Sequence, residues 1–261
     1  MSKKASPGQY NIRVVEKTFR VLGVLSDGKP RTLTEIGREL GINTSTTFRL
    51  VATLKDYKYL ELDELTGKYR LGIACLELSR SYQAGSELLR VAQRELENLR
   101  ETTKETIHLA VLDGMEIIYL EKLDGLHAIG LMISRVGRRA PAYCTGVGKA
   151  LLSQVAPETI LENTNWDTLK RFNDRTIVDP DKLLEHLEAV RQRGFALDEG
   201  EHESEVRCVA APIFDQTGEA VAAISVSGPR SRMEPIGQNE ELIRLTMQAA
   251  QNISAKLGYN R

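Results

Sequence analysis

Apolar residues recur at helical spacing near the start of the chain. Leu33, Ile36 and Leu40 lie at the intervals of three and four residues that place side chains on one face of a helix. Gly41 follows them, and glycine tolerates the positive φ that a tight turn between two helices needs. The pattern therefore predicts a helix that ends at a turn around Gly41.

A second helix is expected directly after this turn. Asn43 and Thr44 belong to the residue types that cap helix N-termini, because their side chains accept a hydrogen bond from a backbone N–H group. The apolar residues Phe48, Val51 and Leu54 are expected to point inward. Two helices joined in this way form a helix-turn-helix, whose second helix enters the major groove of DNA.

Two short runs beyond the second helix predict a β-hairpin. Residues 59–62 and 68–71 have the composition of strands, and the loop 63–67 joins them. An isolated helix-turn-helix pattern is a weak motif, and its alternative is an ordinary amphipathic helix pair with Ser and Thr present for capping and solubility. The hairpin adds the wing of a winged helix, which favours DNA binding over that alternative.

The polar face of the second helix and the hairpin supply the candidate DNA contacts. Short hydroxyl side chains near the start of a recognition helix approach phosphates and base edges closely, and an arginine reaches a phosphate or a guanine. Basic residues of the hairpin are placed to meet the DNA backbone. The expected DNA-binding residues are Thr44, Ser45, Thr47, Arg49, Lys58, Lys68 and Arg70.

Charge is distributed unevenly along the 261 residues, although the formal net charge is only −1. Residues 1–71 hold 13 basic and 8 acidic side chains, whereas residues 72–261 hold 22 basic and 28 acidic ones. Attraction to phosphates needs a local positive field rather than a basic protein as a whole. The distribution therefore favours DNA binding by the N-terminal end.

The length and the change of pattern after the hairpin indicate two domains joined by a linker. Ile73, Leu76, Leu78 and Tyr82 lie at roughly helical spacing, and their apolar face either supports dimerisation or packs back on its own domain. Symmetric pairing would double the phosphate contacts, so we expect a homodimer. The expected boundaries are 1–72 for the DNA-binding domain, 73–85 for a linker helix and 86–261 for a second domain.

The remainder of the chain alternates strand and helix signals. Two apolar runs flank Asp113 and Gly114, a dipeptide that favours a type I′ hairpin turn. An antiparallel sheet flanked by helices follows from this alternation, so the expected fold class is α+β. We expect a strand with its loop within 128–143, strands at 207–215 and 220–228, and helices at 147–155, 180–193 and 239–257.

The cysteines and the apolar runs indicate the compartment in which the protein is expected. The three cysteines, Cys75, Cys144 and Cys208, are far apart and odd in number, so reduced thiols are expected rather than a disulfide framework. No run of eighteen apolar residues occurs, and the first ten residues lack the apolar core of a signal peptide. We therefore expect a soluble, cytoplasmic protein without a membrane partner.

Four segments, in order, carry a family resemblance. They are the winged helix, "RVGRRAPAYCTGVGKALL", "DEGEHESEVRCVAAPIFD" and "AAISVSGP". In them the chain resembles the IclR family of bacterial transcriptional regulators. The resemblance implies a GAF-like C-terminal domain that binds a small, often carboxylate-bearing metabolite, in dimers or tetramers that regulate catabolic operons. We expect a repressor whose partners are double-stranded operator DNA and a small carboxylate effector.

The expected effector pocket combines a glycine loop with a serine pair. Gly146 and Gly148 precede a helix, where exposed N–H groups and the helix dipole favour an anionic oxygen, although a plain strand-to-helix connection is the alternative. Ser225 and Ser227 share one face of a strand, so they can bind one ligand, each other or water. The resemblance implies contacts at Gly146, Val147, Asp198, Cys208, Ser225 and Ser227, with apolar walls from Ile129, Met132, Tyr143 and Val206, four residues that on their own are typical of a core.

Two alternatives involve the cysteines. Cys208 or Cys144 could act as a nucleophile with His202 or His108 as its base, or the thiols could sense oxidants in a redox-sensing regulator. Good metal-ligand types occur at Asp198, His202, Cys144 and Cys208, but their spacing supports no zinc site. The chain also lacks a glycine-rich nucleotide loop and a nucleophile elbow. We therefore expect no catalytic residue, no metal and no cofactor.

Overall fold

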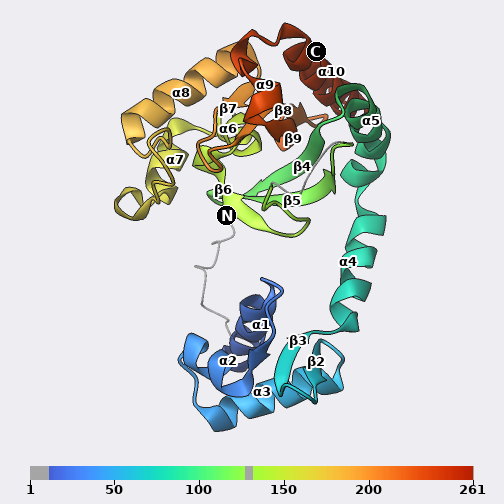
Figure 1. Cartoon of the computed structure of the whole chain (residues 1–261), viewed down its shortest axis with the longest axis vertical. Helices are drawn as coiled ribbons and strands as arrows, with labels where there is room; N and C mark the ends of the chain where they lie inside the picture. The colour runs from blue at the N-terminus through green and yellow to red at the C-terminus, as the bar shows by residue number, and fades with distance from the viewer. Residues whose placement is uncertain (1–11, 127–131, 261) are drawn as a thin grey trace, which may run out of the picture. The chain divides into compact units, whose positions relative to one another are not determined.

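The computed structural model describes residues 12–126 and 132–260 (Figure 1). The chain divides into two compact units, Met1–Ser86 and Glu87–Arg261. Among the described residues, no helix is both long enough and apolar enough to cross a membrane.

The first unit contains helices and one small sheet. Its three strands are antiparallel in the order β1-β3-β2, and β2 and β3 form a hairpin that follows the third helix in the chain. The winged helix-turn-helix predicted from the sequence is confirmed. Its elements are α1 (Arg13–Leu25), β1 (Arg31–Thr32), α2 (Leu33–Leu40), α3 (Thr44–Asp56), β2 (Leu60–Asp63) and β3 (Lys68–Leu71), followed by α4 (Ile73–Gly85).

Local hydrogen bonds fix where the two central helices begin and end. Thr32 and Glu35 form a capping box at the start of α2, in which each side chain accepts the backbone N–H of the other residue. Gly41 ends α2 with a φ of 65° in the left-handed region, as the predicted turn requires. Asn43 caps α3 by accepting the N–H of Thr46 at 2.8 Å.

Helix α3 buries Val51 and Leu54 as predicted, but not Phe48. Phe48 was expected to point inward, but its side chain is 58% exposed. The buried residues of α3 are Thr47, Leu50, Val51 and Leu54. Because an α-helix turns by about 100° per residue, burying Leu50 and Leu54 brings Thr47 onto the same face. Phe48 is therefore turned toward solvent, and its predicted position is wrong.

The second unit is built on a six-stranded sheet in the order β6-β5-β4-β9-β8-β7, in which every neighbouring pair is antiparallel. The α+β class expected from the sequence is confirmed. Its elements are α5 (Glu87–Thr103), β4 (Thr106–Asp113), β5 (Glu116–Leu123), β6 (Arg139–Pro141), α6 (Gly146–Leu152), α7 (Pro157–Asn163), α8 (Pro180–Arg193), β7 (Ala196–Asp198), β8 (Val206–Phe214), β9 (Ala220–Pro229), α9 (Arg230–Met233) and α10 (Glu240–Lys256).

The two faces of this sheet pack against different helices. Ile107 and Leu109 of β4 belong to the hydrophobic core formed with α5 and α10. Ala110 belongs to a second core, formed with α6 and α8. Because successive side chains of a strand point to opposite faces, His108 lies on the same face as Ala110. The face beneath α6 is therefore where polar residues of the central strands gather.

The hairpin between β4 and β5 is confirmed, but its turn type is not the one predicted. Asp113 pairs with Glu116, so the two central residues of the turn are Gly114 and Met115. Gly114 has a φ of 63°, whereas Met115 is not among the described residues with positive φ. A type I′ turn needs positive φ at both central residues, and a type II′ turn needs it only at the first. The backbone therefore fits type II′.

Candidate functional site

The exposed side of α3 forms a continuous polar surface with one aromatic residue. We call Thr44, Ser45, Phe48 and Arg49 the recognition face, since all four are exposed and their spacing places them on one side of the helix. The N–H groups in the first turn of a helix have no intrahelical partner, so they can donate to a phosphate. This face therefore offers donors for both phosphates and base edges.

Thr47 was predicted to contact DNA, and that prediction is wrong because its side chain is completely buried. The Thr47 hydroxyl donates to the carbonyl oxygen of Asn43 at 3.0 Å. A Cβ atom added to Gly37 would lie 2.9 Å from Thr47 Oγ1, so α2 and α3 approach closely at this point. Thr47 therefore packs at the contact between α2 and α3, while Phe48 lies on the recognition face.

The basic residues predicted for the hairpin are exposed. Lys58 stands before β2 with a φ of 62°, and Lys68 and Arg70 lie on β3. The Arg70 guanidinium contacts the carboxylate of Glu61 at 3.0 Å. An exposed ion pair of this kind contributes little free energy, so it does not prevent Arg70 from turning to a phosphate.

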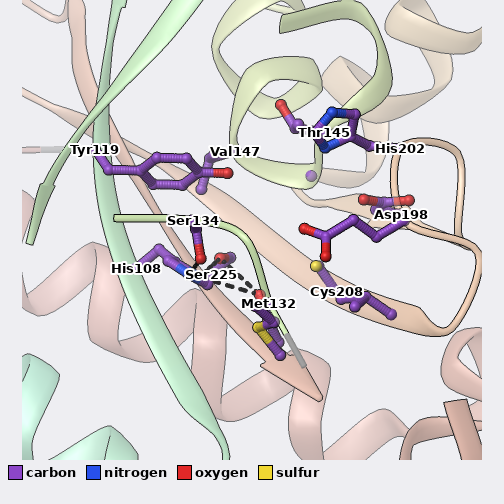
Figure 2. A pocket seen from close by; sticks show the side chains of 14 residues that line it. His108, Tyr119, Met132, Ser134, Thr145, Val147, Asp198, His202, Cys208 and Ser225 are labelled. Carbon is purple, nitrogen blue, oxygen red and sulfur yellow. Dashed lines mark hydrogen bonds between the residues drawn. The ribbon is translucent and has the colours of Figure 1, made fainter. Parts of the chain in front are cut away.

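A small pocket of about 30 Å³ lies between the sheet and the start of α6 (Figure 2). The structure brings eight of the ten predicted effector residues to its walls: Met132, Gly146, Val147, Asp198, Val206, Cys208, Ser225 and Ser227. It also places there six residues that were not predicted as effector contacts: His108, Tyr119, Ser134, Thr145, His202 and Glu203.

The two remaining predicted residues do not line this pocket. Tyr143 is buried in the hydrophobic core that includes α6 and α8, and its hydroxyl donates to the carbonyl oxygen of Lys170 at 2.7 Å. Its predicted position in the wall is therefore wrong, because the short turn after β6 directs the side chain into that core. Ile129 lies outside the described residues.

Strand register explains why distant residues meet here. Asp198 of β7 pairs with Cys208 of β8, and Cys208 pairs with Ser227 of β9. On the next strand, His108 of β4 pairs with Ser225. Side chains at paired positions stand beside each other on one face of a sheet. Five polar or sulfur-bearing side chains from four strands therefore converge below the N-terminus of α6.

His108 is the centre of the hydrogen-bond network in the pocket (Figure 2). Its Nε2 atom lies 2.9 Å from Ser134 Oγ, and its Nδ1 atom lies 3.2 Å from Ser227 Oγ and 3.3 Å from Ser225 Oγ. The two serine hydroxyls lie 3.2 Å apart, as their predicted common face allows. Burial, with a smaller contribution from Lys122, lowers the pKa of His108 to about 3, so the ring is neutral near pH 7.

Two carboxyl groups face the pocket, and His202 is the lining residue that acts on the pKa of one of them, Asp198. Asp198 Oδ1 accepts the N–H groups of Gly200 and Glu201, both at 2.9 Å, yet burial raises the pKa of Asp198. Glu203 accepts the N–H of Ile133 at 3.3 Å, and burial likewise raises its pKa. None of the described lining residues is Lys or Arg. The pocket is therefore polar but holds no cationic side chain.

A buried ion pair connects α6 to the loop after β7. Lys149 is completely buried and contacts the carboxylate of Glu201, which is 5% exposed. Burial raises the pKa of Glu201 to about 7, although Lys149 acts in the opposite direction. The other carboxylate oxygen, Oε2, has no hydrogen-bond partner within the described part of the chain. The loop that follows Asp198 is thus tied to α6 by a pair of charges.

The thiols do not resemble reactive ones. Burial raises the pKa of both Cys144 and Cys208, whereas nucleophilic and redox-sensing cysteines have lowered pKa values and access to solvent. His108 is bonded to serines, and the His202 ring packs edge-on against Phe172 at 4.6 Å. The described residues also contain no group of three metal-ligating side chains that could hold an ion. This geometry disfavours both cysteine-based alternatives.

Comparison with known proteins gives a consistent result over nearly the whole chain. The family model of the IclR helix-turn-helix domain matches residues 14–64, and the model of the bacterial transcriptional regulator IclR C-terminal domain matches residues 81–255. The HTH-type transcriptional regulator KdgR of Escherichia coli is 33% identical over 250 residues, covering 96% of this chain and 94% of that protein. The E. coli repressor AllR is 31% identical, covering 96% of this chain and 92% of that protein.

A solved structure supports the same assignment. An IclR homologue from Microbacterium hydrocarbonoxydans, crystallised as a complex with 4-hydroxybenzoate, superimposes with a TM-score of 0.79 and 29% sequence identity. The match covers 94% of this chain and 98% of that one.

Proposed function

This chain belongs to the IclR family of helix-turn-helix transcriptional regulators with a C-terminal effector-binding domain, and from that premise we propose that it represses a catabolic operon until a small carboxylate metabolite binds. The observation that carries the proposal is the pocket beneath α6, where buried polar groups of four strands converge. Relatives named as transcriptional regulators, together with the raised thiol pKa values, support a protein without catalytic activity.

We propose that the recognition face enters the major groove of operator DNA. Thr44 and Ser45 then approach phosphates and base edges, Arg49 reaches a phosphate or a guanine, and Phe48 can contact a thymine methyl group. Lys58, Lys68 and Arg70 would contact the backbone from the hairpin. In this proposal residues 1–72 bind DNA, residues 86–261 bind the effector, and the helix at 73–85 links these two domains.

We propose a homo-oligomer from the apolar surface that two helices leave uncovered. Val14 and Phe19 of α1 are 56% and 66% exposed. Helix α4 has no buried residue, and its large apolar side chains are about half exposed or more. Exposed apolar surface of this extent is typical of an interaction site, and a second copy would cover it symmetrically. A dimer would present two recognition helices to a palindromic operator.

The effector carboxylate is proposed to bind between the first turn of α6 and the serine pair. The N–H groups of Gly146 and Val147 and the hydroxyls of Ser225 and Ser227 are the donors. Burial raises the pKa of Asp198, so its carboxyl group can take up a proton and, in the neutral form, donate a hydrogen bond to the ligand. Protonation there would remove the repulsion between two carboxylates.

The size of the pocket suggests how binding changes the protein. A cavity of about 30 Å³ has room for little more than one water molecule, far below the roughly 300 Å³ or more of ordinary small-molecule sites. An effector must therefore enlarge the pocket, so it binds one arrangement of the C-terminal unit better than the other. Such a difference in affinity is what a ligand needs to shift a conformational equilibrium.

A thermal-shift screen of the full chain against carboxylates, including 4-hydroxybenzoate, pyruvate and sugar acids, tests the proposal. A compound that raises Tm is then titrated into a fluorescence-polarisation assay with duplex DNA from the region upstream of the protein's own gene. We expect the DNA affinity to fall at saturating effector. Unchanged DNA affinity and unchanged DNA geometry would contradict the proposal.

Gly146→Val provides a matched control for this screen. A Cβ atom at position 146 would lie 3.2 Å from Cys208 Cβ and 3.4 Å from Ala210 Cβ, so a valine crowds the pocket wall that β8 forms. The variant should lose the thermal shift while its affinity for DNA without effector stays close to that of the parent.

A further inference from the structure

One imidazole binds hydroxyl groups from two separate segments of the second unit. Ser225 and Ser227 reach His108 Nδ1 from β9, and Ser134 reaches Nε2 from the segment that precedes β6. His108 is 4% exposed, and each of the three serines is at most 5% exposed. Neither the sequence pattern nor the family resemblance points to His108 as an effector contact. Its position follows only from the pairing of β4 with β9.

A neutral imidazole imposes opposite hydrogen-bond roles on its two sides. One ring nitrogen carries a proton and donates, while the other accepts. If Nδ1 donates to the serine pair, Nε2 must accept from the Ser134 hydroxyl, and the reverse tautomer exchanges these roles. The direction in which Ser225 and Ser227 present their hydroxyl protons to the cavity is therefore coupled to the ring and to Ser134.

Burial and, less strongly, Lys122 lower the pKa of His108 and favour the neutral ring, whereas Asp124 acts in the opposite direction. Lys122 is paired with His108 across β4 and β5, and its ammonium group contacts Asp124 at 2.9 Å. Tyr119 of β5 lies with its ring centroid 5.1 Å from that of His108. From the other side, Cys208 of β8 and the carboxyl groups of Asp198 and Glu203 face the same pocket. No carboxylate is hydrogen-bonded to the imidazole in the described residues, so a positive charge on the ring would have no direct acidic partner.

We propose that His108 is the positioning residue of the effector pocket: its uncharged imidazole orients the Ser225 and Ser227 hydroxyls toward the effector and ties Ser134 to the same hydrogen-bond network. The inference rests on the effector pocket proposed above and adds to it the chemistry of recognition. The part of the effector that faces β9 is an oxygen-bearing group, a carboxylate, carbonyl or hydroxyl, bound by hydrogen bonds and not by a cation.

The state of the ring is tested without any effector. Full-length protein labelled with ¹⁵N in histidine is followed by NMR from pH 5.5 to 8, and His108→Asn assigns the signal by its loss. We expect two widely separated ring nitrogen shifts, typical of one fixed neutral tautomer, that stay constant over this range. Merging of the two shifts into those of an imidazolium, or averaging between tautomers, would overturn the inference.

Two conservative variants separate positioning from a general structural role. Asparagine places its amide near the position of Nδ1, so His108→Asn keeps a partner for Ser225 and Ser227 and loses the one for Ser134. Glutamine reaches the position of Nε2, so His108→Gln keeps Ser134 and loses the serine pair. The probe is 4-hydroxybenzoate together with any compound that raised the Tm of the parent chain, measured by titration calorimetry.

The expected difference is one of affinity between two equally folded variants. His108→Asn should bind within about threefold of the parent, and His108→Gln should bind about tenfold more weakly, the usual effect of losing one well-placed hydrogen bond. Equal losses in both variants, in proportion to their loss of Tm, would show a merely structural role and overturn the inference. A parent chain that binds no carboxylate contradicts the proposed function, whereas the NMR result still decides the state of His108.

Discussion

The recognition face and the effector pocket are both polar, but they are built in opposite ways. The recognition face consists of four exposed residues within six positions of one helix. The pocket gathers buried groups from four strands, and without a ligand three of its serines are hydrogen-bonded to His108. An effector must therefore compete with bonds already made inside the protein, whereas DNA competes only with water. Substitutions of buried pocket residues should consequently affect stability as well as ligand binding, whereas substitutions on the recognition face should affect DNA binding alone.

The largest effect on stability is expected at the buried ion pair between Lys149 of α6 and Glu201. Lys149→Met should destabilise the protein by about 3–5 kcal/mol, because it leaves the Glu201 carboxylate buried without its partner. Urea unfolding followed by circular dichroism measures this change. The exposed Lys182 of α8 provides the control, since Lys182→Met should change stability by less than about 0.5 kcal/mol.

The same variant should show a characteristic pH dependence. Burial raises the pKa of Glu201 above its ordinary value of 4.5, so the neutral form is favoured in the folded state and stability is lost as the pH rises through the folded pKa. Without Lys149 this loss should increase, since Lys149 holds that pKa down. The destabilisation should therefore be smaller at pH 5.5 than at pH 8, and an equal value at both would contradict a charge-based cause.

A smaller effect is expected where α2 and α3 touch. Gly37→Ala places a Cβ atom 2.9 Å from Thr47 Oγ1 and 3.1 Å from the carbonyl oxygen of Ile42, so it should destabilise the first unit by about 1–3 kcal/mol. Gly23→Ala on α1 meets no atom within 4 Å and should stabilise by up to about 1 kcal/mol. Thermal unfolding measures the Tm of both variants: a lower Tm for Gly37→Ala and a higher Tm for Gly23→Ala would support the close contact between α2 and α3.

The winged helix could be predicted because its signals are local. Caps, a turn glycine and apolar spacing all lie within a few residues of the elements they define, as Asn43 and Gly41 illustrate. The errors concern the rotation of α3 about its own axis. Leu50, Val51 and Leu54 together define the buried side of α3 and place Thr47 on it, whereas the spacing of Val51 and Leu54 alone is also compatible with an inward Phe48.

The pocket could be predicted only in part, and mainly through the family resemblance. The serine pair follows from strand alternation, but the approach of His108 depends on which strands are neighbours and in which register. Tyr143 shows the opposite failure, since an aromatic residue next to the glycine loop packs into the core and not into the pocket. Long-range pairing is the information that a single sequence lacks.

An intermediate effect on DNA binding is expected at the recognition face. Arg49→Ala should weaken binding to duplex DNA about tenfold and reduce the slope of log affinity against log salt by about 0.9, because one phosphate contact is lost. Fluorescence polarisation at several salt concentrations measures both. Arg94→Ala, at an exposed position of α5, should leave both unchanged. An unaltered salt slope in Arg49→Ala would argue against a phosphate contact.

The smallest effect compares one substitution at two positions on the same helix. Thr47→Val removes a buried hydroxyl whose acceptor, the carbonyl oxygen of Asn43, still receives the Thr47 N–H, so it should cost about 1 kcal/mol or less of stability. Thr44→Val removes an exposed hydroxyl from the recognition face and should weaken DNA binding with no measurable change in stability. Because Thr47 cannot reach DNA from the core, Thr47→Val should bind DNA like the parent once both are fully folded. Polarisation titrations measure the DNA affinity of the two variants, and thermal unfolding measures their stability. A loss of DNA affinity in folded Thr47→Val would show that Thr47 contacts DNA after all.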